Sequence, residues 1–450
     1  MKRLVTIFTI VLCVIPLVAQ EAEAEATQNP FGFSAGIALG TDIIPGANGT
    51  TETWNSLAFQ PDIALGKFGI GLDITLRFKL FPDPNTAMTI YGGDWIPNYN
   101  DNGKTFLDLY LPKFMYIRYG LRGEPFFIKF GSINDFTIGN GFLMNNYANT
   151  SFLPELRISG LHLGFDGTML NFPYVGFEAL TGNLARFDVI GARLFVRPFA
   201  WLEAAVIKDM QIGGSIITDT TPSLYSAANP GLASVTMGGV DIFVPLVQNP
   251  VFPLAVFTDY ALQVDRWGWM LGFGGKLAGL IVYGAQLRIM SSGFIPAYFD
   301  ANYDLYRDIK ALTLSQTPTG NGFQGWFAQL GFDILESKLV LKINLEGPFA
   351  AIPEVPVDNP ALYPHLRGTF VVGEGLLGGF FFDFAYDKYF IGRTTGFFDD
   401  LVDPTNAVIT AAVNFRSGSA VFTLLYNLRY NPLAPNGFDV TSSLKTTIKF

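Results

Sequence analysis

Apolar and polar residues alternate along several segments that are each about ten residues long. The clearest segments are 69–80, 338–346, 422–430 and 440–450. In the first of them the apolar positions are Ile70, Leu72, Ile74, Leu76, Phe78 and Leu80, and the intervening polar positions include Asp73, Thr75, Arg77 and Lys79. A period of two residues is typical of a β-strand with one apolar and one polar face. The pattern therefore predicts many antiparallel strands of similar length.

A water-soluble β-sandwich shows the same alternation, so the composition of the two faces matters. Here the polar faces carry Arg, Lys and Asp, whereas the opposite faces are almost uniformly apolar over a length that crosses a membrane. Aromatic residues gather at the strand ends, as at 267–269, 380–382, Tyr386 and Tyr389. Transmembrane barrels carry such aromatic girdles at both membrane surfaces. This arrangement favours the barrel.

The chain offers no convincing transmembrane helix. A spanning helix needs about 20 apolar residues, and the best stretch, 269–287, contains Lys276, Gln286 and five glycines. The whole chain has 48 Gly and 27 Pro beside 43 Phe, a mixture that helices tolerate poorly. Since only helices and closed barrels satisfy their backbone hydrogen bonds in lipid, a barrel is the structure left for a membrane protein of this composition.

Long polar stretches alternate with tight turns along the chain. The long stretches are 41–55, 81–104, 132–153, 209–234, 291–323, 347–364 and 388–404. Bacterial barrels place short turns in the periplasm and long loops outside. Together with briefer connections, this pattern predicts an all-β, transmembrane, antiparallel up-and-down barrel of about 20 strands (range 16–20), with both chain ends in the periplasm.

The N-terminus has the features of a secretory signal peptide. Lys2 and Arg3 precede an apolar run at 4–18, and the small residue Ala19 offers a cleavage position. We therefore expect a signal peptide at 1–20, a short periplasmic segment at 21–30 and the outer-membrane barrel at 31–450. Cys13, the sole cysteine, lies in the signal; the bulky residue before it and the continuing apolar run speak against a lipoprotein.

Composition also excludes several chemistries. The net charge of −9 argues against a nucleic-acid partner, because phosphate binding needs clustered cations. His162 and His365 are the only histidines and lie far apart in sequence, so a histidine-rich metal site is excluded, and His162 is expected at the membrane interface. No phosphate-binding glycine motif is present. We expect no enzyme, no metal and no cofactor.

The last strand carries the sharpest motif. The sequence Leu444-Lys-Thr-Thr-Ile-Lys-Phe450, together with a signal peptide and alternating strands, resembles Gram-negative outer-membrane barrels of the porin type. The resemblance implies that the barrel-assembly machinery reads this strand through Leu444, Ile448 and Phe450. The segment 130–149 also resembles stretches of spirochaetal barrels, which names no activity.

A barrel of this width must be filled by loops or water. If it is a pore, its selectivity resides in residues that face the lumen. The alternation assigns to the lumen the charged residues Asp73, Arg77, Lys79, Arg157, Arg193, Glu203, Asp259, Arg288, Asp333, Lys342, Asp383, Arg429 and Lys445. Each of them is alternatively a generic residue of a wet wall.

The third long loop is the candidate constriction. Its residues Gly139, Gly141, Phe142, Met144, Asn145 and Tyr147 combine tight-turn formers with apolar side chains that are unfavourable in bulk water. In porins the third external loop folds inward. The alternative is a loop that packs on the rim or contains a short extra strand.

These features lead to one main function and two rivals. The main expectation is a pore for passive passage of small hydrophilic solutes through the outer membrane, whose partners are outer-membrane lipid and the assembly machinery. The first rival is a FadL-like transporter of hydrophobic molecules, suited by the apolar third loop and by Phe323, Trp326 and Phe327. The second is a structural or adhesive surface barrel that uses its loops, especially 291–323. A homo-oligomer is open, because nothing in the sequence identifies a subunit interface.

Deletion of Phe450 is expected to impair membrane insertion more than deletion of any one outer loop, because the assembly signal would be lost. The fraction of folded barrel in outer-membrane preparations, read from its heat-modifiable gel migration, measures this. Normal insertion without Phe450 would contradict the signal.

Overall fold

The computed structural model describes residues 32–45, 51–83, 85–99, 103–204, 206–226, 229–318, 320–353, 359–431, 434 and 436–450. The expected signal peptide (1–20), the periplasmic segment (21–30) and Phe31 lie outside the described residues. The signal peptide and the periplasmic segment therefore stay predictions.

Antiparallel strands form one continuous sheet in the described part of the chain. In chain order they are β1 (Gly32–Pro45), β2 (Thr51–Leu65), β3 (Phe68–Leu72), β4 (Ile74–Asp83), β5 (Thr86–Ile90), β6 (Phe114–Tyr119), β7 (Phe126–Gly131), β8 (Gly160–Asp166), β9 (Val175–Thr181), β10 (Val189–Val196), β11 (Gln211–Asp219), β12 (Val235–Val247), β13 (Leu254–Gln263), β14 (Arg266–Leu277), β15 (Ile281–Met290), β16 (Phe323–Ile334), β17 (Leu339–Pro348), β18 (His365–Leu377), β19 (Phe380–Lys388), β20 (Ala407–Ser417), β21 (Ala420–Tyr430) and β22 (Phe438–Lys449).

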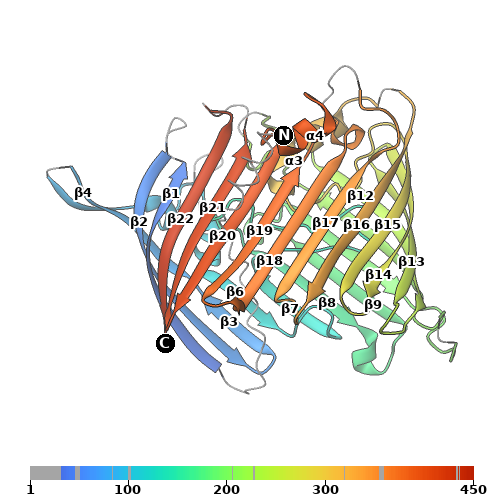
Figure 1. The fold of residues 1–450 in the computed structure, drawn as a ribbon, viewed down its shortest axis with the longest axis horizontal. Helices are drawn as coiled ribbons and strands as arrows, with labels where there is room; N and C mark the ends of the chain where they lie inside the picture. The colour runs from blue at the N-terminus through green and yellow to red at the C-terminus, as the bar shows by residue number, and fades with distance from the viewer. Residues whose placement is uncertain are drawn as a thin grey trace.

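The described strands build a closed wall of 20 antiparallel strands. β3 and β4 follow one another along the same edge of β2 and are separated only at Asp73, so they count as one wall strand. β5 pairs with β4 alone and forms a hairpin that extends beyond the wall, at the left in Figure 1. The predicted barrel of about 20 strands is confirmed.

The seam of the barrel joins the first strand to the last. β1 pairs with β22 from Gly36 opposite Lys449 to Ile43 opposite Ser442. The chain end completes this ladder, because the Phe450 N–H donates to the Ala35 carbonyl at 2.9 Å and the Ala35 N–H donates to the Phe450 carbonyl at 3.0 Å. The first and last strands of the wall are thereby paired with each other.

The two faces of the wall follow the alternation seen in the sequence. On β22 the outward residues Leu444 and Ile448 are 56% and 48% exposed, whereas Ser443, which precedes Leu444 and points inward, is buried at 3%. Leu330 on β16 is 63% exposed on the same outer surface. The lipid-facing side is therefore apolar and the inner side polar, as the period of two requires.

Short turns lie at one rim and long connections at the other. The chain end lies at the turn rim, which is the lower rim in Figure 1, and helices α3 and α4 lie at the upper rim. The helical segments of the described residues are η2 (Gly92–Asp94), α2 (Phe106–Tyr110), η3 (Leu111–Lys113), η4 (Gly167–Leu170), α3 (Tyr303–Ser315), η5 (Pro360–Leu362) and α4 (Phe397–Val402). None of these described helices is long and apolar enough to cross a membrane.

Three predicted loops differ from the structure. Residues 41–45 and 51–55 of the first belong to β1 and β2, and the second (81–104) contains β5. The stretch 209–234, expected as a single outer loop, contains β11, and the connection before β11 lies at the turn rim. The sequence Gly213-Gly-Ser215 interrupts the apolar alternation there, so the strand shows a weak pattern. The backbone of β11 nevertheless pairs fully with β10 and β12.

Gly40 in the seam offers a test of close strand packing. A Cβ at Gly40 would lie 2.2 Å from the Leu444 carbonyl oxygen, so Gly40→Ala should destabilise the barrel by about 1–3 kcal/mol through overpacking. We expect a lower unfolding temperature on heat-modifiability gels. The matched control is Gly214→Ala, where nothing lies within 4 Å. Equal unfolding temperatures for the two variants would contradict the tight seam.

Candidate functional site

A chain of charged side chains crosses neighbouring strands on the inner face of the wall. Arg288 on β15 pairs with Glu346 on β17. The other Glu346 oxygen lies 2.9 Å from His365 Nδ1, and Asp387 Oδ1 lies 2.5 Å from His365 Nε2. Asp387 also pairs with Arg367. Side chains on one face of adjacent strands are near neighbours, so this chain follows directly from the strand register.

The outer loops are attached to this chain of charges. The Tyr389 ring stacks on His365 with centroids 4.2 Å apart and an interplanar angle of 10°. The Tyr389 hydroxyl donates to Asp300 Oδ2 at 3.2 Å. Asp300 belongs to the connection between β15 and β16 and also pairs with Lys310 at 2.6 Å. The charged side chains of the wall thus position one another, and through Tyr389 and Asp300 they also position the connection between β15 and β16.

A second charged cluster lies near the seam. Arg77 on β4 pairs with Asp42 on β1 at 3.0 Å and with Asp94 in the following connection at 2.9 Å. The other Asp42 oxygen accepts from the Ser443 hydroxyl at 2.5 Å, and Lys445 Nζ lies 3.6 Å from it. Cations and carboxylates therefore alternate around the inner face here too.

The connection between β7 and β8, residues 132–159, is here termed the crossing loop. Near its start the Asn140 amide donates to Asp259 on β13 at 2.6 Å. Near its end the carbonyl of Leu153 accepts from Asn427 on β21 at 2.5 Å, and that of Pro154 accepts from Arg77 at 2.5 Å. Since β13 and β21 belong to different sides of the closed wall, the loop runs through the inside of the barrel.

A second loop joins the crossing loop inside the barrel. This helical loop comprises residues 291–318 and 320–322 and contains α3. Backbone bonds join the loops directly: the Asn145 N–H donates to the Phe299 carbonyl at 2.9 Å, and the Ala297 N–H donates to the Phe142 carbonyl at 2.8 Å. The rings of Phe142 and Phe294 stack at 5.1 Å. The two loops form one packed unit.

This unit has a hydrophobic core of its own against the inner wall. From the loops the core takes Ile133, Phe136, Ile138, Phe142, Leu143, Met144, Tyr147, Phe294, Ile295, Tyr298, Phe299, Tyr303, Ala311 and Leu314. From the strands and their ends it takes Leu180, Val189, Ile217, Val235, Met237, Ala261, Met270 and Met290. Burial of this much apolar surface is the main stabilisation of the inward loop position.

A buried arginine fixes α3 to the loop rim. Arg307 pairs with Asp219 at 2.6 Å, with Asp188 at 2.8 Å and, more distantly, with Asp304 at 3.5 Å. The Tyr303 hydroxyl donates to Asp219 at 2.6 Å. Three carboxyl groups surround one guanidinium, so full ionisation would leave excess negative charge in a buried site.

The Asp304 carboxyl relieves this excess by retaining its proton. Burial, reinforced by the nearby Asp188 and Asp219 carboxylates, raises the pKa of Asp304 to about 8 in spite of the opposing Arg307 charge. Burial also raises the pKa of Asp188 above its usual value. The docked position of α3 therefore favours the protonated form of the cluster.

Most of the predicted lumen residues lie at inward positions of strands. Their backbone register places on this face Asp73, at the junction of β3 and β4, together with Arg77, Lys79, Arg193, Asp259, Arg288, Asp333, Lys342, Asp383, Arg429 and Lys445. Several are paired, as Arg193 is with Asp241 at 2.6 Å. That they line the path of a solute stays a prediction.

Besides Asp73, two predicted lumen residues lie outside the strands, Glu203 and Arg157. Glu203 was expected on the inner wall but is exposed in the turn between β10 and β11. The ladder of β10 ends at Val196, and Pro198 follows without an N–H that could continue it. Arg157 lies at the end of the crossing loop and pairs with Asp73 at 3.0 Å. It faces the wall from inside the barrel.

The predicted constriction residues all lie in the crossing loop. Gly139 and Gly141 adopt positive φ angles of 58° and 86°, which glycine allows without strain. Phe142, Met144 and Tyr147 are buried in the shared core. In place of an extra strand, this segment has isolated bridges, with Phe136 opposite Tyr147 and Met144 opposite Phe299. Its role as a constriction stays a prediction.

The sequence pattern missed several residues of this interior. His162 was expected at the membrane interface, but it lies on the inner face of β8 between the rings of Phe127 and Phe136, each 5.5 Å away. Glu346, His365, Asp387 and the Arg307 cluster were not assigned to the lumen. The inward parity of β17, β18 and β19 could have indicated the first three. In the described ranges no cluster of carboxylate and histidine side chains is arranged to hold a metal ion.

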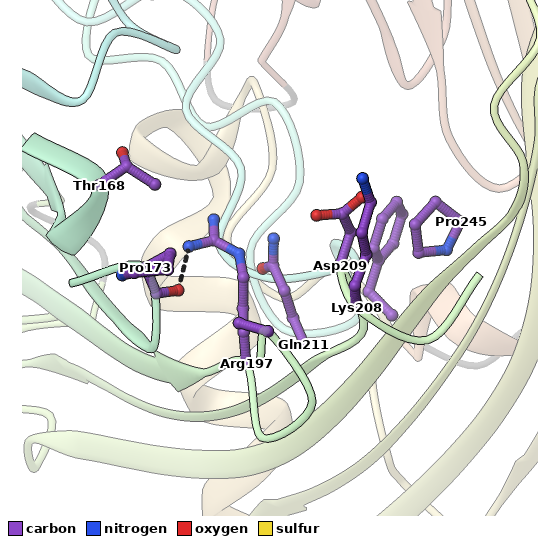
Figure 2. Close-up of a pocket in the computed structure, with 9 residues that line it drawn as sticks. Thr168, Pro173, Arg197, Lys208, Asp209, Gln211 and Pro245 are labelled. Atoms are coloured by element: carbon purple, nitrogen blue, oxygen red, sulfur yellow. Dashed lines mark hydrogen bonds between the residues drawn. The ribbon is translucent and has the colours of Figure 1, made fainter. Parts of the chain in front are cut away.

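A cavity of about 510 Å³ opens on the inner wall near the turn rim. Figure 2 shows Arg197 donating to the Pro173 carbonyl, with Gln211 beside it and Lys208 and Asp209 beyond. Arg197 also pairs with Asp166 at 2.5 Å. Cations and carboxylates therefore lie together at this end of the lumen as well.

No protein-family model matches the chain, and no curated protein matches it. Among solved structures it is similar to OccAB2 of Acinetobacter baumannii, with 10% identity over 93% of this chain and 98% of that one and a TM-score of 0.35. OccK8 (OprE) of Pseudomonas aeruginosa has 9% identity over 93% and 97%, with a TM-score of 0.36. A BenF-like porin from Pseudomonas fluorescens Pf-5 has 8% identity over 93% and 98%, with a TM-score of 0.32.

At identities and scores this low, nothing about this chain's solute follows from these porins. The three organisms are Acinetobacter and Pseudomonas species. The resemblance of 130–149 to spirochaetal barrels therefore receives no support from them.

The Asp304 cluster predicts a pH-dependent docking of α3. A carboxyl whose pKa is raised by docking stabilises the docked state fully below its ordinary value of about 4, and this contribution is lost as pH rises toward about 8. Hydrogen exchange of residues 303–315, corrected for the intrinsic rate, should accelerate over this range.

Asp304→Asn should flatten this response, because the amide stays neutral. Asp403→Asn in a different outer loop is the control and should leave the response of α3 unchanged. A response that persists fully in Asp304→Asn would contradict the role of this carboxyl.

Proposed function

We propose that the protein is an outer-membrane pore through which small hydrophilic solutes pass passively. The observation that carries this proposal is the separation of polar and apolar groups inside the barrel. The inner wall presents charged side chains of both signs, whereas the apolar side chains of the two inward loops are withdrawn into their own core. A solute inside the barrel therefore meets mainly polar groups and water.

The outer surface supports a membrane position. Its strands present exposed apolar residues such as Leu194, Ile216 and Leu330, and the wall is closed by the pairing of β1 with β22. In lipid each unpaired backbone group would cost several kcal/mol. The barrel is therefore suited to contact outer-membrane lipid around its circumference.

The inner surface favours hydrophilic over hydrophobic cargo. Phe142, Met144 and Tyr147, which suggested a FadL-like transporter, are buried against other loop residues and leave little apolar surface facing a passage. Phe327 lies under the Arg288 guanidinium at 5.2 Å, and its neighbour Trp326 has the outward parity of β16. We therefore place the transporter second.

A surface-adhesive role would require the helical loop to extend outward. Tyr303, Arg307 and Leu314 of that loop are instead buried inside the barrel mouth. The helical loop, which the adhesive hypothesis assigned to partner binding, is thus packed against its own barrel. This observation favours passage of solutes over adhesion.

The proposal includes partners for assembly. Leu444, Ile448 and Phe450 present exposed side chains on the outer face of the last strand, where the barrel-assembly machinery could contact them. No catalytic step is part of the proposed function. A homo-oligomer is compatible with it but is not required.

Purified protein in planar bilayers is expected to show a steady ion conductance with weak selectivity, because cations and carboxylates are interspersed on the inner wall. Lys342 is exposed on the inner face of β17, so Lys342→Glu should shift the reversal potential in a KCl gradient toward cation selectivity. Lys338→Glu, at the turn before β17, changes the charge equally and should shift it less.

Absence of conductance from folded protein would overturn the pore. If lipid or fatty acid co-purified at the same time, the transporter would replace it. Equal shifts in the two lysine variants would contradict a path along the Lys342 wall.

A further inference from the structure

A small hollow lies between the crossing loop and the wall of β13 to β16. Its volume is about 210 Å³, below the range of about 300–1,000 Å³ that is typical of pockets for drug-sized ligands. Two facing glycines, Gly274 and Gly284, line it, and there the wall has no side chains. The space corresponds to about seven water molecules at roughly 30 Å³ each.

Four amide side chains line this hollow, and each has one end held by the protein. Asn140 Nδ2 donates to Asp259 at 2.6 Å and to the Ile242 carbonyl at 3.3 Å. Asn145 Oδ1 accepts from Asn146 Nδ2 at 3.1 Å. These bonds fix the two amides that come from the crossing loop.

The two wall amides are held in the same way. Gln286 Oε1 accepts from Arg288 Nε at 3.0 Å, and Gln329 Nε2 donates to Asn344 at 3.0 Å. Partners that lock a side chain reduce the entropy it loses when a ligand binds. All four amides are therefore oriented in advance.

The opposite ends of the four amides have no hydrogen-bond partner among the described residues. They are the donors Asn145 Nδ2 and Gln286 Nε2 and the acceptors Asn140 Oδ1 and Gln329 Oε1. None is a fully buried unpartnered atom, so each can reach solvent or a ligand. The amides that line the hollow thus keep both hydrogen-bond donors and hydrogen-bond acceptors available.

The presence of both donors and acceptors favours one chemical class of ligand. A carboxylate only accepts hydrogen bonds and an ammonium only donates them, whereas a hydroxyl does both. The nearest charges are already engaged, Asp259 by Asn140 and Arg288 by Gln286 and Glu346. The hollow therefore suits neutral hydroxyl groups better than either type of ion.

Aromatic rings complete the lining. Phe257 and Phe327 border the same space as the amides. The C–H face of a sugar ring packs well on such a ring, because the aromatic face is electronegative and apolar. Amides around the edge and aromatic surface at the side match a molecule with a polar rim and an apolar face.

We propose that this hollow binds one neutral polyhydroxylated solute of monosaccharide size during its passage. The assignment rests on the proposed pore function and adds the substrate class. Solutes would meet the site where the crossing loop approaches the wall. Binding there would be weak, since a passage site must also release its solute.

Ligand-observed saturation-transfer NMR on folded, full-length protein in detergent tests this class. The probes are glucose, glucuronate as a ring-matched anion and hexanol as an apolar control. We expect glucose to bind more tightly than both. Gln286→Leu and Gln329→Leu should each weaken glucose binding about two- to tenfold, which corresponds to one lost hydrogen bond. Gly284→Ala should weaken it as well, because a Cβ fits there at 3.4 Å from its nearest neighbour and fills the hollow.

Gln324→Leu is the matched control for Gln329→Leu, because both residues lie on β16 but Gln324 is exposed on the outer face. Heat-modifiable migration verifies that each variant is folded. Equal glucose binding in the wild type and the three site variants, or tighter binding of glucuronate, would overturn the inference. Conductance of the same preparations separates this failure from that of the pore. A conducting protein that does not bind glucose loses only the polyol site. Glucose binding without conductance keeps the polyol site but removes the pore, and with it the role of the site in passage.

Discussion

The rest of the structure depends on closure of the backbone hydrogen-bond ladder. In lipid an unpaired N–H or carbonyl has no water to bond, so a spanning sheet must close on itself. The pairing of β1 with β22, extended by Ala35 and Phe450, achieves this closure. Once 20 strands are closed, the ring is too wide for wall side chains to fill it. Filling the interior then becomes the task of the loops.

The crossing loop and the helical loop fill the interior through two kinds of contact, apolar contacts with each other and charged contacts with the wall. Apolar residues such as Phe142 and Phe299 pack between the loops, while charged groups such as Arg77 and Arg307 attach the loops to the wall and rim. The apolar core supplies most of the stabilisation, because removal of such area from water is favourable without any specific partner. The charged contacts fix where the loops sit, and at Asp304 they make that position depend on pH.

The wall could be predicted from the sequence because the alternation of apolar and polar residues within each strand shows which of them face lipid and which face inward. The alternation at 69–80 assigned Asp73, Arg77 and Lys79 to the inner side from neighbouring residues alone. The loops could not be predicted in the same way, since their partners are distant in sequence. The bond between Asn427 and Leu153 spans 274 positions. The predictions for β11 and Glu203 were wrong for local reasons. Glycines weakened the alternating pattern of β11, so the strand was taken for a loop. At Glu203 the apparent alternation of β10 continued past Pro198, where the strand has already ended.

The crossing loop also has a mechanical consequence. A closed ladder fixes the circumference of a ring but leaves its cross-section free to flatten. Asn140 ties the loop to β13, and the carbonyls at 153–154 tie it to β21 and β4. The loop is thereby an internal strut between separate parts of the wall, and it sets the distance between them. The shape of the bore is then a property of this one loop, even where the loop itself does not touch what passes through.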